Sequence, residues 1–404
     1  MKTAAKALRF TRVKLTNWRN FRSAEVNLSS RAFLVGPNAS GKSNFLDALR
    51  FLRDLAKPTG GLATALASRS RPASGAATSP TAAALSGLSA VRCLEARNPS
   101  YVELDVDVGT DETPNRWGYQ LQFGRKGSEK FATVLQEIVR LPNGKTIRHQ
   151  RLAGDDDALQ FTQTKLEQVG QNKEFRELVE FFASIRYLHV VPQIVRDPQR
   201  AQKDEDPYGG DLLQRIKDMP KKTREPRLRR ISAALQIAVP QFRDLQLEDD
   251  NQGRPHLLAS YEHWRPNASK QSEEVFSDGT LRLIGFLWSI TEKGGPLLLE
   301  EPELSLHDAI SAQIPAMITR AQRLSGRQVI STTHSFAMLD SPGVGLQEVH
   351  RLVVGQSGTT IETAADNPRV AAQVREAGWT VGAAVLPLAK ADKLETLAQL
   401  DVAN

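Results

Sequence analysis

The residues best suited to chemistry form one glycine-rich stretch near the N-terminus. Two glycines five positions apart are followed by a lysine and a hydroxyl residue, which is the P-loop pattern. An apolar strand is expected at 31–35, and apolar residues recur at helical spacing over 44–55. Loop N–H groups and the positive end of the following helix wrap the phosphates of a nucleoside triphosphate. The stretch consists of Gly36, Pro37, Asn38, Ala39, Ser40, Gly41, Lys42 and Ser43, with Asn44 next in the helix.

Two side chains of this stretch have specific expected roles. Lys42 reaches the β- and γ-phosphates as a fixed positive charge, and Ser43 ligates Mg²⁺. A side chain at Gly41 would block the close approach of the phosphates. We therefore predict a site for a nucleoside triphosphate and Mg²⁺.

A second candidate cluster lies far downstream, where the apolar residues 297–299 lead directly into two acids. Burying a charge without a partner is costly, so an apolar strand that ends in two carboxylates indicates that these side chains have a function. We predict that Glu300 belongs to the Mg²⁺ shell. Glu301 is expected to act as the general base that polarises the attacking water.

The composition narrows the protein class. The chain has 404 residues, a net charge of +7 and one cysteine, Cys93, which excludes disulfides within the chain and cysteine-based zinc sites. The N-terminus lacks the apolar stretch of a signal peptide, and the longest apolar runs are too short to span a bilayer, so we expect a cytoplasmic protein without a membrane partner. The basic balance is compatible with a polyanion partner.

The elements that must position these residues follow from periodicity. Alternation predicts strands at 7–16 and 24–28, and further strands between 101 and 152 that form an antiparallel sheet. The small residues of 57–90 predict a flexible loop, or alternatively a lid or partner-binding element that orders on contact. Residues 159–240 look mainly helical, without a heptad run long enough for a coiled coil.

These patterns together resemble the SMC/RecF/OLD branch of ABC-type ATPases. The resemblance rests on the strand pair with its Asn17–Phe21 turn, the P-loop and the acidic strand end, in that order. It implies an α/β fold: an ABC-type P-loop NTPase head with an antiparallel β lobe, an inserted mainly helical region and no long coiled coil. The implied parts are an N-terminal ATPase lobe at 1–158, a helical insertion at 159–265 and a C-terminal ATPase lobe at 266–404.

The resemblance also implies further site residues. Residues 276–282 are similar to the ABC signature, and 304–307 fall where such heads carry the D-loop. His334, after the apolar strand 328–333, matches the switch histidine that contacts the γ-phosphate. Arg19 or Arg22 either touches phosphate or is a solvated arginine of the turn. The signature residues expected to bind the nucleotide of a second subunit are Ser277, Asp278 and Gly279. The candidates for a glutamine near Mg²⁺ are Gln120, Gln122 and Gln193.

Short stand-alone heads of this kind, grouped as AAA15/AAA_21 or OLD-like ATPases, are common in bacterial anti-phage systems. The resemblance thus implies an ATP hydrolase that forms a homodimer or larger homo-oligomer around ATP. Such a head acts as sensor or scaffold for an effector protein encoded nearby. The alternative is a RecF-like ATPase of DNA repair and recombination.

One cluster of positive charge is a candidate nucleic-acid contact. Side chains of this kind neutralise backbone phosphates, but a solvated helical face is an equally good interpretation of the same residues. The acidic run 155–157 is interpreted as a solvated loop rather than a metal site. The basic cluster comprises Lys217, Lys221, Lys222, Arg224, Arg227, Arg229 and Arg230.

Overall fold

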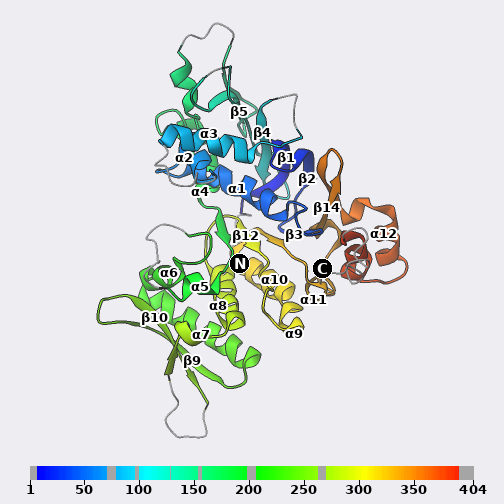
Figure 1. The fold of residues 1–404 in the computed structure, drawn as a ribbon. Helices are drawn as coiled ribbons and strands as arrows, with labels where there is room; N and C mark the ends of the chain where they lie inside the picture. Colours follow the sequence, from blue (N-terminus) through cyan, green and yellow to red (C-terminus); the bar gives the residue numbers. More distant parts are fainter. Residues whose placement is uncertain are drawn as a thin grey trace, which may run out of the picture.

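The residues that the structure describes form three β-sheets, shown as a ribbon in Figure 1. The computed structural model describes residues 7–70, 79–95, 100–127, 129–152, 157–197, 206–262 and 270–390. Within these ranges, no helix has the length and apolar character needed to cross a membrane.

The central sheet has six strands in the order β15-β14-β3-β13-β12-β8. Its strands are parallel except β15, which pairs antiparallel with β14. The middle strands are buried runs of apolar residues, as expected for a parallel sheet covered on both faces. The strands are β3 (Arg31–Val35), β8 (Arg186–Leu188), β12 (Leu297–Glu300), β13 (Val329–Thr332), β14 (Val349–Gly355) and β15 (Gly358–Thr363).

The two faces of this sheet belong to two hydrophobic cores. Successive side chains of a strand point to opposite faces. Accordingly Leu34 and Leu298 lie in one core with α1 (Lys42–Ala56), whereas Phe33 and Leu299 lie in the other with α8 (Asp278–Thr291). The helix after the P-loop and the helix of the expected signature therefore cover opposite faces of the sheet.

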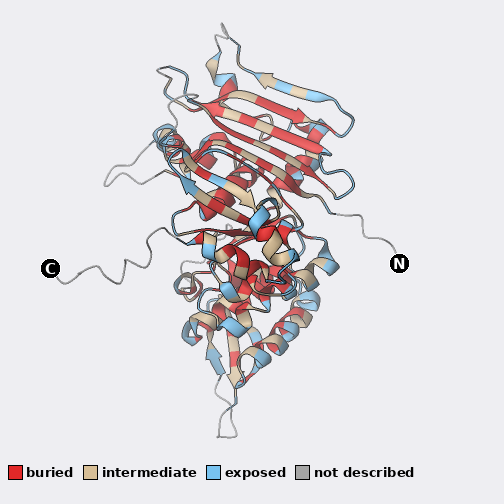
Figure 2. Cartoon of the chain, turned by 90° about the vertical axis from the view of Figure 1, so that its right-hand side faces the viewer, coloured by how far each residue is buried: buried red, intermediate tan, exposed pale blue. Residues whose placement is uncertain are grey.

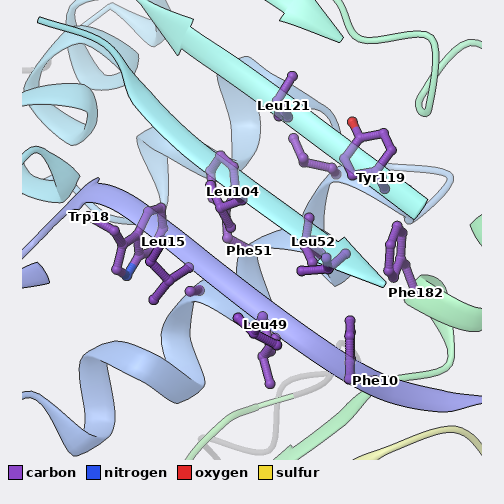
Figure 3. Close-up of a cluster of buried hydrophobic side chains, with 14 of the residues drawn as sticks. Phe10, Leu15, Trp18, Leu49, Phe51, Leu52, Leu104, Tyr119, Leu121 and Phe182 are labelled. Carbon is purple, nitrogen blue, oxygen red and sulfur yellow. The ribbon is translucent and has the colours of Figure 1, made fainter. Parts of the chain in front are cut away.

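The second sheet is antiparallel, with the order β2-β1-β4-β5-β6-β7, which confirms the predicted antiparallel lobe. Figure 3 shows side chains of β1, β4 and β5 facing those of α1, where Phe51 contacts both Trp18 and Phe123. In Figure 2 the buried residues, in red, gather along the strands of both large sheets. The strands are β1 (Arg9–Trp18), β2 (Phe21–Asn27), β4 (Val102–Gly109), β5 (Trp117–Gly124), β6 (Thr133–Arg140) and β7 (Thr146–Gln150).

The segment 57–90, predicted to be a flexible loop, forms helices over its described residues. They are α2 (Leu62–Ala67) and α3 (Pro80–Val91), the latter capped by Ser79 with Pro80 at its first position. The prediction was wrong there because small residues allow close packing: a Cβ at Gly87 would lie 1.8 Å from the carbonyl oxygen of Leu66. Residues 71–78 lie outside the described part.

The region 159–265 contains strands as well as helices. Its helices are α4 (Arg176–Ala183), α5 (Pro192–Val195), α6 (Leu212–Asp218) and α7 (Lys221–Ala238). Strand β8 belongs to the central sheet, and β9 (Phe242–Asp249), β10 (Pro255–Tyr261) and β11 (Lys270–Ser272) form a small antiparallel sheet. The remaining helices are α9 (Asp308–Ser311), α10 (Ile314–Ser325), α11 (Phe336–Leu339), α12 (Pro368–Arg375) and α13 (Val381–Val385).

Candidate functional site

The glycine-rich loop connects β3 with α1, as predicted. Gly41 has a φ of 102°, and a Cβ there would lie 2.1 Å from the side-chain amide nitrogen of Asn20, so the position requires glycine for two reasons. Ala39 adopts a φ of 61°, a conformation that non-glycine residues rarely take outside functional loops. Lys42, the first residue of α1, curls back so that its Nζ donates to the carbonyls of Gly36 at 3.0 Å and Pro37 at 3.1 Å.

Asn20, in the turn between β1 and β2, holds the loop from outside. Its side-chain amide donates to the carbonyl of Ser40 and to the hydroxyl of Thr359, each at 2.7 Å, and its amide oxygen accepts from Asn44 at 2.7 Å. One asparagine therefore joins the loop, the start of α1 and strand β15. Sequence analysis missed this role because its partners lie up to 339 positions away.

Glu300 and Ser43 meet where β12 ends and α1 begins. The Ser43 hydroxyl donates to Oε1 of Glu300 at 2.5 Å, and the Tyr187 hydroxyl donates to Oε2. A carboxylate and a hydroxyl beside a phosphate-binding loop form the small all-oxygen donor set that suits Mg²⁺, which takes its other ligands from phosphate and water. The residues present fit the predicted cation.

Glu301 is held in position by its backbone and by His334. Its φ of 44° turns the chain sharply after β12, and its amide donates to the Thr332 hydroxyl at 3.1 Å. Nε2 of His334 lies 3.2 Å from Oε1 of Glu301. The hydrogen bond from His334 lowers the pKa of Glu301, outweighing the burial that raises it, so the carboxylate stays ionised as a base must.

The charge of Lys42 is influenced by the acidic side chains of the site. Burial lowers the pKa of Lys42, while the carboxylates of Glu301, Glu300 and Glu303 act in the opposite direction. The ammonium group thus lies in the field of three acids, where a triphosphate and a divalent cation would enter together.

Glu303 supports the loop that carries His334. Its Oε1 accepts from the Thr333 hydroxyl at 2.5 Å and from the His334 amide at 3.0 Å. Burial raises the pKa of Glu303 despite these bonds. Sequence analysis did not single out this acid, although its place two residues after Glu301 was a usable signal.

The predicted signature residues begin helix α8. The Ser277 hydroxyl accepts from the Thr280 amide at 3.2 Å, an N-cap, and Asp278 pairs with Arg196 at 2.5 Å. A Cβ at Gly279 would lie 2.6 Å from the carbonyl oxygen of Ser305 in the expected D-loop. In the described part of the chain, no hydrogen bond joins residues 277–279 to the P-loop of the same chain.

A cavity of about 660 Å³ opens beside the P-loop. Its size suits a small ligand. It is lined by Asn20, Ala39 and Asn44 of the site, by the end of α3 and by the β14–β15 hairpin. The cavity offers space for the nucleoside part of a nucleotide whose phosphates lie on the loop. Its walls come from segments far apart in the sequence, so local sequence patterns do not predict it.

The candidate arginines and glutamines differ in their contacts and in their exposure to solvent. Arg19 pairs with Asp47 at 2.7 Å, and Arg22 is exposed. Gln120 and Gln122 lie on β5, where Gln122 bonds to Glu103. Gln193 lies in α5, which follows β8 of the central sheet, and is exposed.

The basic cluster divides into structural and exposed members. The guanidinium of Arg227 lies 4.7 Å from the ring centroid of Trp288 and donates to Thr291, and Lys217 pairs with Asp249 at 3.1 Å. Arg224 donates to the carbonyl of Lys217 at 2.9 Å. The exposed members are Lys221, Lys222, Arg229 and Arg230. Of the acidic run, Asp157 caps a short 3₁₀ helix, and 155–156 lie outside the described residues.

One known protein is similar to a short part of the chain. Endonuclease GajA of Bacillus cereus (strain VD045) is 43% identical over 47 residues, which are 12% of this chain and 8% of that protein. The chain thus matches a small part of that relative's length.

Similar solved structures are SMC heads. The SMC head bound to the C-winged helix domain of ScpA has 14% identity and a TM-score of 0.46 and covers 88% of this chain and 97% of that chain. The SMC head domain of Thermotoga maritima has 14% identity and a TM-score of 0.40, covering 88% and 98%. The Pyrococcus furiosus Smc head with an extended coiled coil, bound to the C-terminal domain of ScpA, has 12% identity and a TM-score of 0.48, covering 92% and 100%.

Residues 31–340 match the family described as "AAA domain, putative AbiEii toxin, Type IV TA system". This range runs from the P-loop strand through both acidic residues to His334 and α11. The chain therefore belongs to this AAA_21 family of P-loop ATPases, as its motifs predicted.

Proposed function

We propose that the chain binds ATP with Mg²⁺, hydrolyses it, and closes as a dimer around it. The observation that carries the proposal is the convergence of Lys42, Ser43, Glu300, Glu301 and His334 at the carboxyl end of the central sheet. Ligands of α/β sheets bind at this edge.

The surroundings of these residues allow a specific role for each in ATP hydrolysis. Phosphate oxygens would replace the two loop carbonyls that Lys42 now contacts. Ser43 and Glu300 would hold Mg²⁺, which supplies charge neutralisation at the β- and γ-phosphates when bound. Glu301 accepts a proton from water while the water oxygen bonds to the γ-phosphorus. The bond from that phosphorus to the bridging oxygen breaks, releasing ADP and phosphate.

Two substitutions test the chemistry. Lys42→Ala should abolish detectable ATP binding, because the phosphates lose their main fixed counter-charge. Glu301→Gln should bind ATP but hydrolyse it about 10²–10⁴-fold more slowly, because the base is lost while the phosphate site remains. Glu274→Gln is the matched control, since Glu274 is exposed and lies outside the site. Equal turnover by Glu301→Gln and wild type would contradict the assignment.

We further propose that the dimer senses or scaffolds for an effector protein in anti-phage defence. The matched family, described as a putative AbiEii toxin of a Type IV TA system, and the short match to an endonuclease support a role beside an effector protein. Co-purification from the native operon, followed by identification of the associated protein, tests it. A neighbour-encoded protein retained by wild type and by Glu301→Gln with ATP is the expected result.

A second candidate is a RecF-like ATPase of DNA repair. The four exposed basic side chains of α7 favour it, because they offer a phosphate-binding face. Stable DNA binding without any associated effector would favour this candidate over defence.

A further inference from the structure

Glu300 has a second hydrogen-bond partner, which no local sequence pattern predicted. Ser43 donates to one carboxylate oxygen, and the Tyr187 hydroxyl donates to the other. Each carboxylate oxygen of Glu300 thus accepts a hydrogen bond from a different donor, and the two bonds together hold the side chain in place.

Strand register explains why Tyr187 reaches Glu300. In the parallel pair of β8 and β12, Tyr187 lies opposite Leu298, two residues before Glu300. Residues two apart point to the same face of a strand. That face is the one covered by α1, which contributes Ser43, and Tyr187 packs against the same hydrophobic core as Leu298.

The tyrosine is held as a hydrogen-bond donor. A tyrosine hydroxyl carries its proton at neutral pH, so it can donate to the Glu300 carboxylate. The guanidinium of Arg50, two turns along α1 from Ser43, lies 5.3 Å from the ring centroid of Tyr187. The ring is thus fixed between β8 and α1.

We propose that Tyr187 is a positioning residue for Glu300, holding one carboxylate oxygen so that the other faces Ser43 and Mg²⁺. This inference rests on the proposed function. Glutamate has one more rotatable bond than aspartate, and ordering that bond costs free energy. A donor on the far oxygen restricts that freedom before the nucleotide binds, which is what a preorganised site requires.

The test removes only the hydroxyl. In a Glu301→Gln background that prevents turnover, binding of a fluorescent ATP analogue is measured while Mg²⁺ is titrated, and again with EDTA. Tyr187→Phe should weaken binding about tenfold in Mg²⁺, the loss expected for a hydrogen bond to a charged group. Binding in EDTA should be unchanged. Tyr261→Phe is the matched control, because its ring packs on Phe242 in the small sheet.

A double variant separates positioning from general damage. Glu300→Asp shortens the side chain so that it no longer reaches the hydroxyl, and Tyr187→Phe should then have no additional effect in Mg²⁺. An equal loss in Mg²⁺ and EDTA, no loss at all, or full additivity with Glu300→Asp would overturn the inference and leave the proposed function standing. Failure of wild type to bind Mg²⁺-ATP would instead overturn the proposed function itself.

Discussion

Asp47 lies at the centre of a charged cluster behind the P-loop. It pairs with Arg19 at 2.7 Å and with Arg69 at 2.9 Å, and Arg50 lies 3.6 Å away. Arg19, a candidate phosphate contact from its place in the sequence, therefore has a carboxylate partner on α1. The cluster ties the β1–β2 turn and the segment after α2 to the helix that begins with Lys42.

The same cluster predicts a pH-dependent part of the stability. Burial alone would raise the pKa of Asp47, but the three arginines lower it from 3.8 to about 2. A carboxylate with a depressed pKa stabilises the fold above its unfolded pKa, and this contribution disappears as the pH falls through the folded value. Asp47→Asn should lower the free energy of unfolding by about 3 kcal/mol at pH 7. The difference from wild type should narrow between about pH 4 and pH 2.

Denaturant titrations at several pH values measure this difference. Asp111→Asn is the control, because its pair with Arg9 is largely exposed on the acidic side and surface pairs contribute little. A gap that stays constant down to pH 2 would show that Asp47 acts through packing rather than charge.

At the scale of elements, the β1–β2 turn clamps the P-loop through Asn20. Asn20→Ala removes three hydrogen bonds at once, to Ser40, Thr359 and Asn44. We expect ATP affinity to fall about tenfold, because part of the binding energy must then order the loop. Asn27→Ala, at an exposed position on β2, should leave the affinity unchanged. Isothermal titration with a non-hydrolysable ATP analogue measures both; equal affinities would show that the loop is ordered without the clamp.

Helix α7 makes a separate prediction for nucleic acid. Reversing its exposed charges at Lys221, Lys222, Arg229 and Arg230 to glutamate should weaken DNA or RNA binding at least tenfold and flatten its salt dependence, because fewer counterions are released. The fold should tolerate this change, since Arg227 holds α7 against Trp288. Filter binding at several salt concentrations is the measurement.

A charge-matched control distinguishes a specific face from net charge. It reverses four other exposed basic residues, Arg125, Lys126, Lys130 and Arg320. Equal weakening by both variants would make α7 an ordinary solvated face.

The elements show which kinds of information the sequence carries. The P-loop, the β12 strand with its two acids and the strand before His334 are local patterns, and each forms the predicted element. Asn20 and Tyr187 act through partners remote in the chain, so the fold is needed to find them. Glu303 also bonds to a remote residue, Thr333, although its place two residues after Glu301 was a usable signal. The error at 57–90 has the same origin, because small residues favour a loop locally but pack tightly as α2 and α3.

At the scale of the whole molecule, the two parts of the expected ATP sandwich belong to opposite faces of one sheet. Lys42 begins α1 in one core, and Ser277 caps α8 in the other. The tight contact of Gly279 with the Ser305 carbonyl joins the signature to the loop that follows Glu301. A nucleotide bound by the signature would thus lie next to the loop that follows Glu301, the proposed general base, in the same chain.

This arrangement predicts sites shared between two chains. In an isologous dimer each chain offers one P-loop and one signature. Ser277→Arg should leave ATP binding at its own P-loop intact but abolish turnover, because the added side chain and charge block closure on the partner's nucleotide. Lys42→Ala should abolish turnover through the P-loop. A mixed dimer contains one intact pair, formed by the P-loop of the Ser277→Arg chain and the signature of the Lys42→Ala chain.

Mixing the two inactive variants is therefore the decisive measurement. With random pairing, half of the dimers are mixed and each has one working site of two, so ATPase activity should recover to about a quarter of wild type. Differently tagged chains, captured in sequence, report whether mixed dimers form. Adding Glu301→Gln to the Ser277→Arg chain, which supplies the P-loop of the repaired site, should abolish the recovery, whereas the same change in the Lys42→Ala chain should not. Mixed dimers without any recovered turnover would contradict the shared site, because every mixed dimer contains one site in which both the P-loop and the signature are intact.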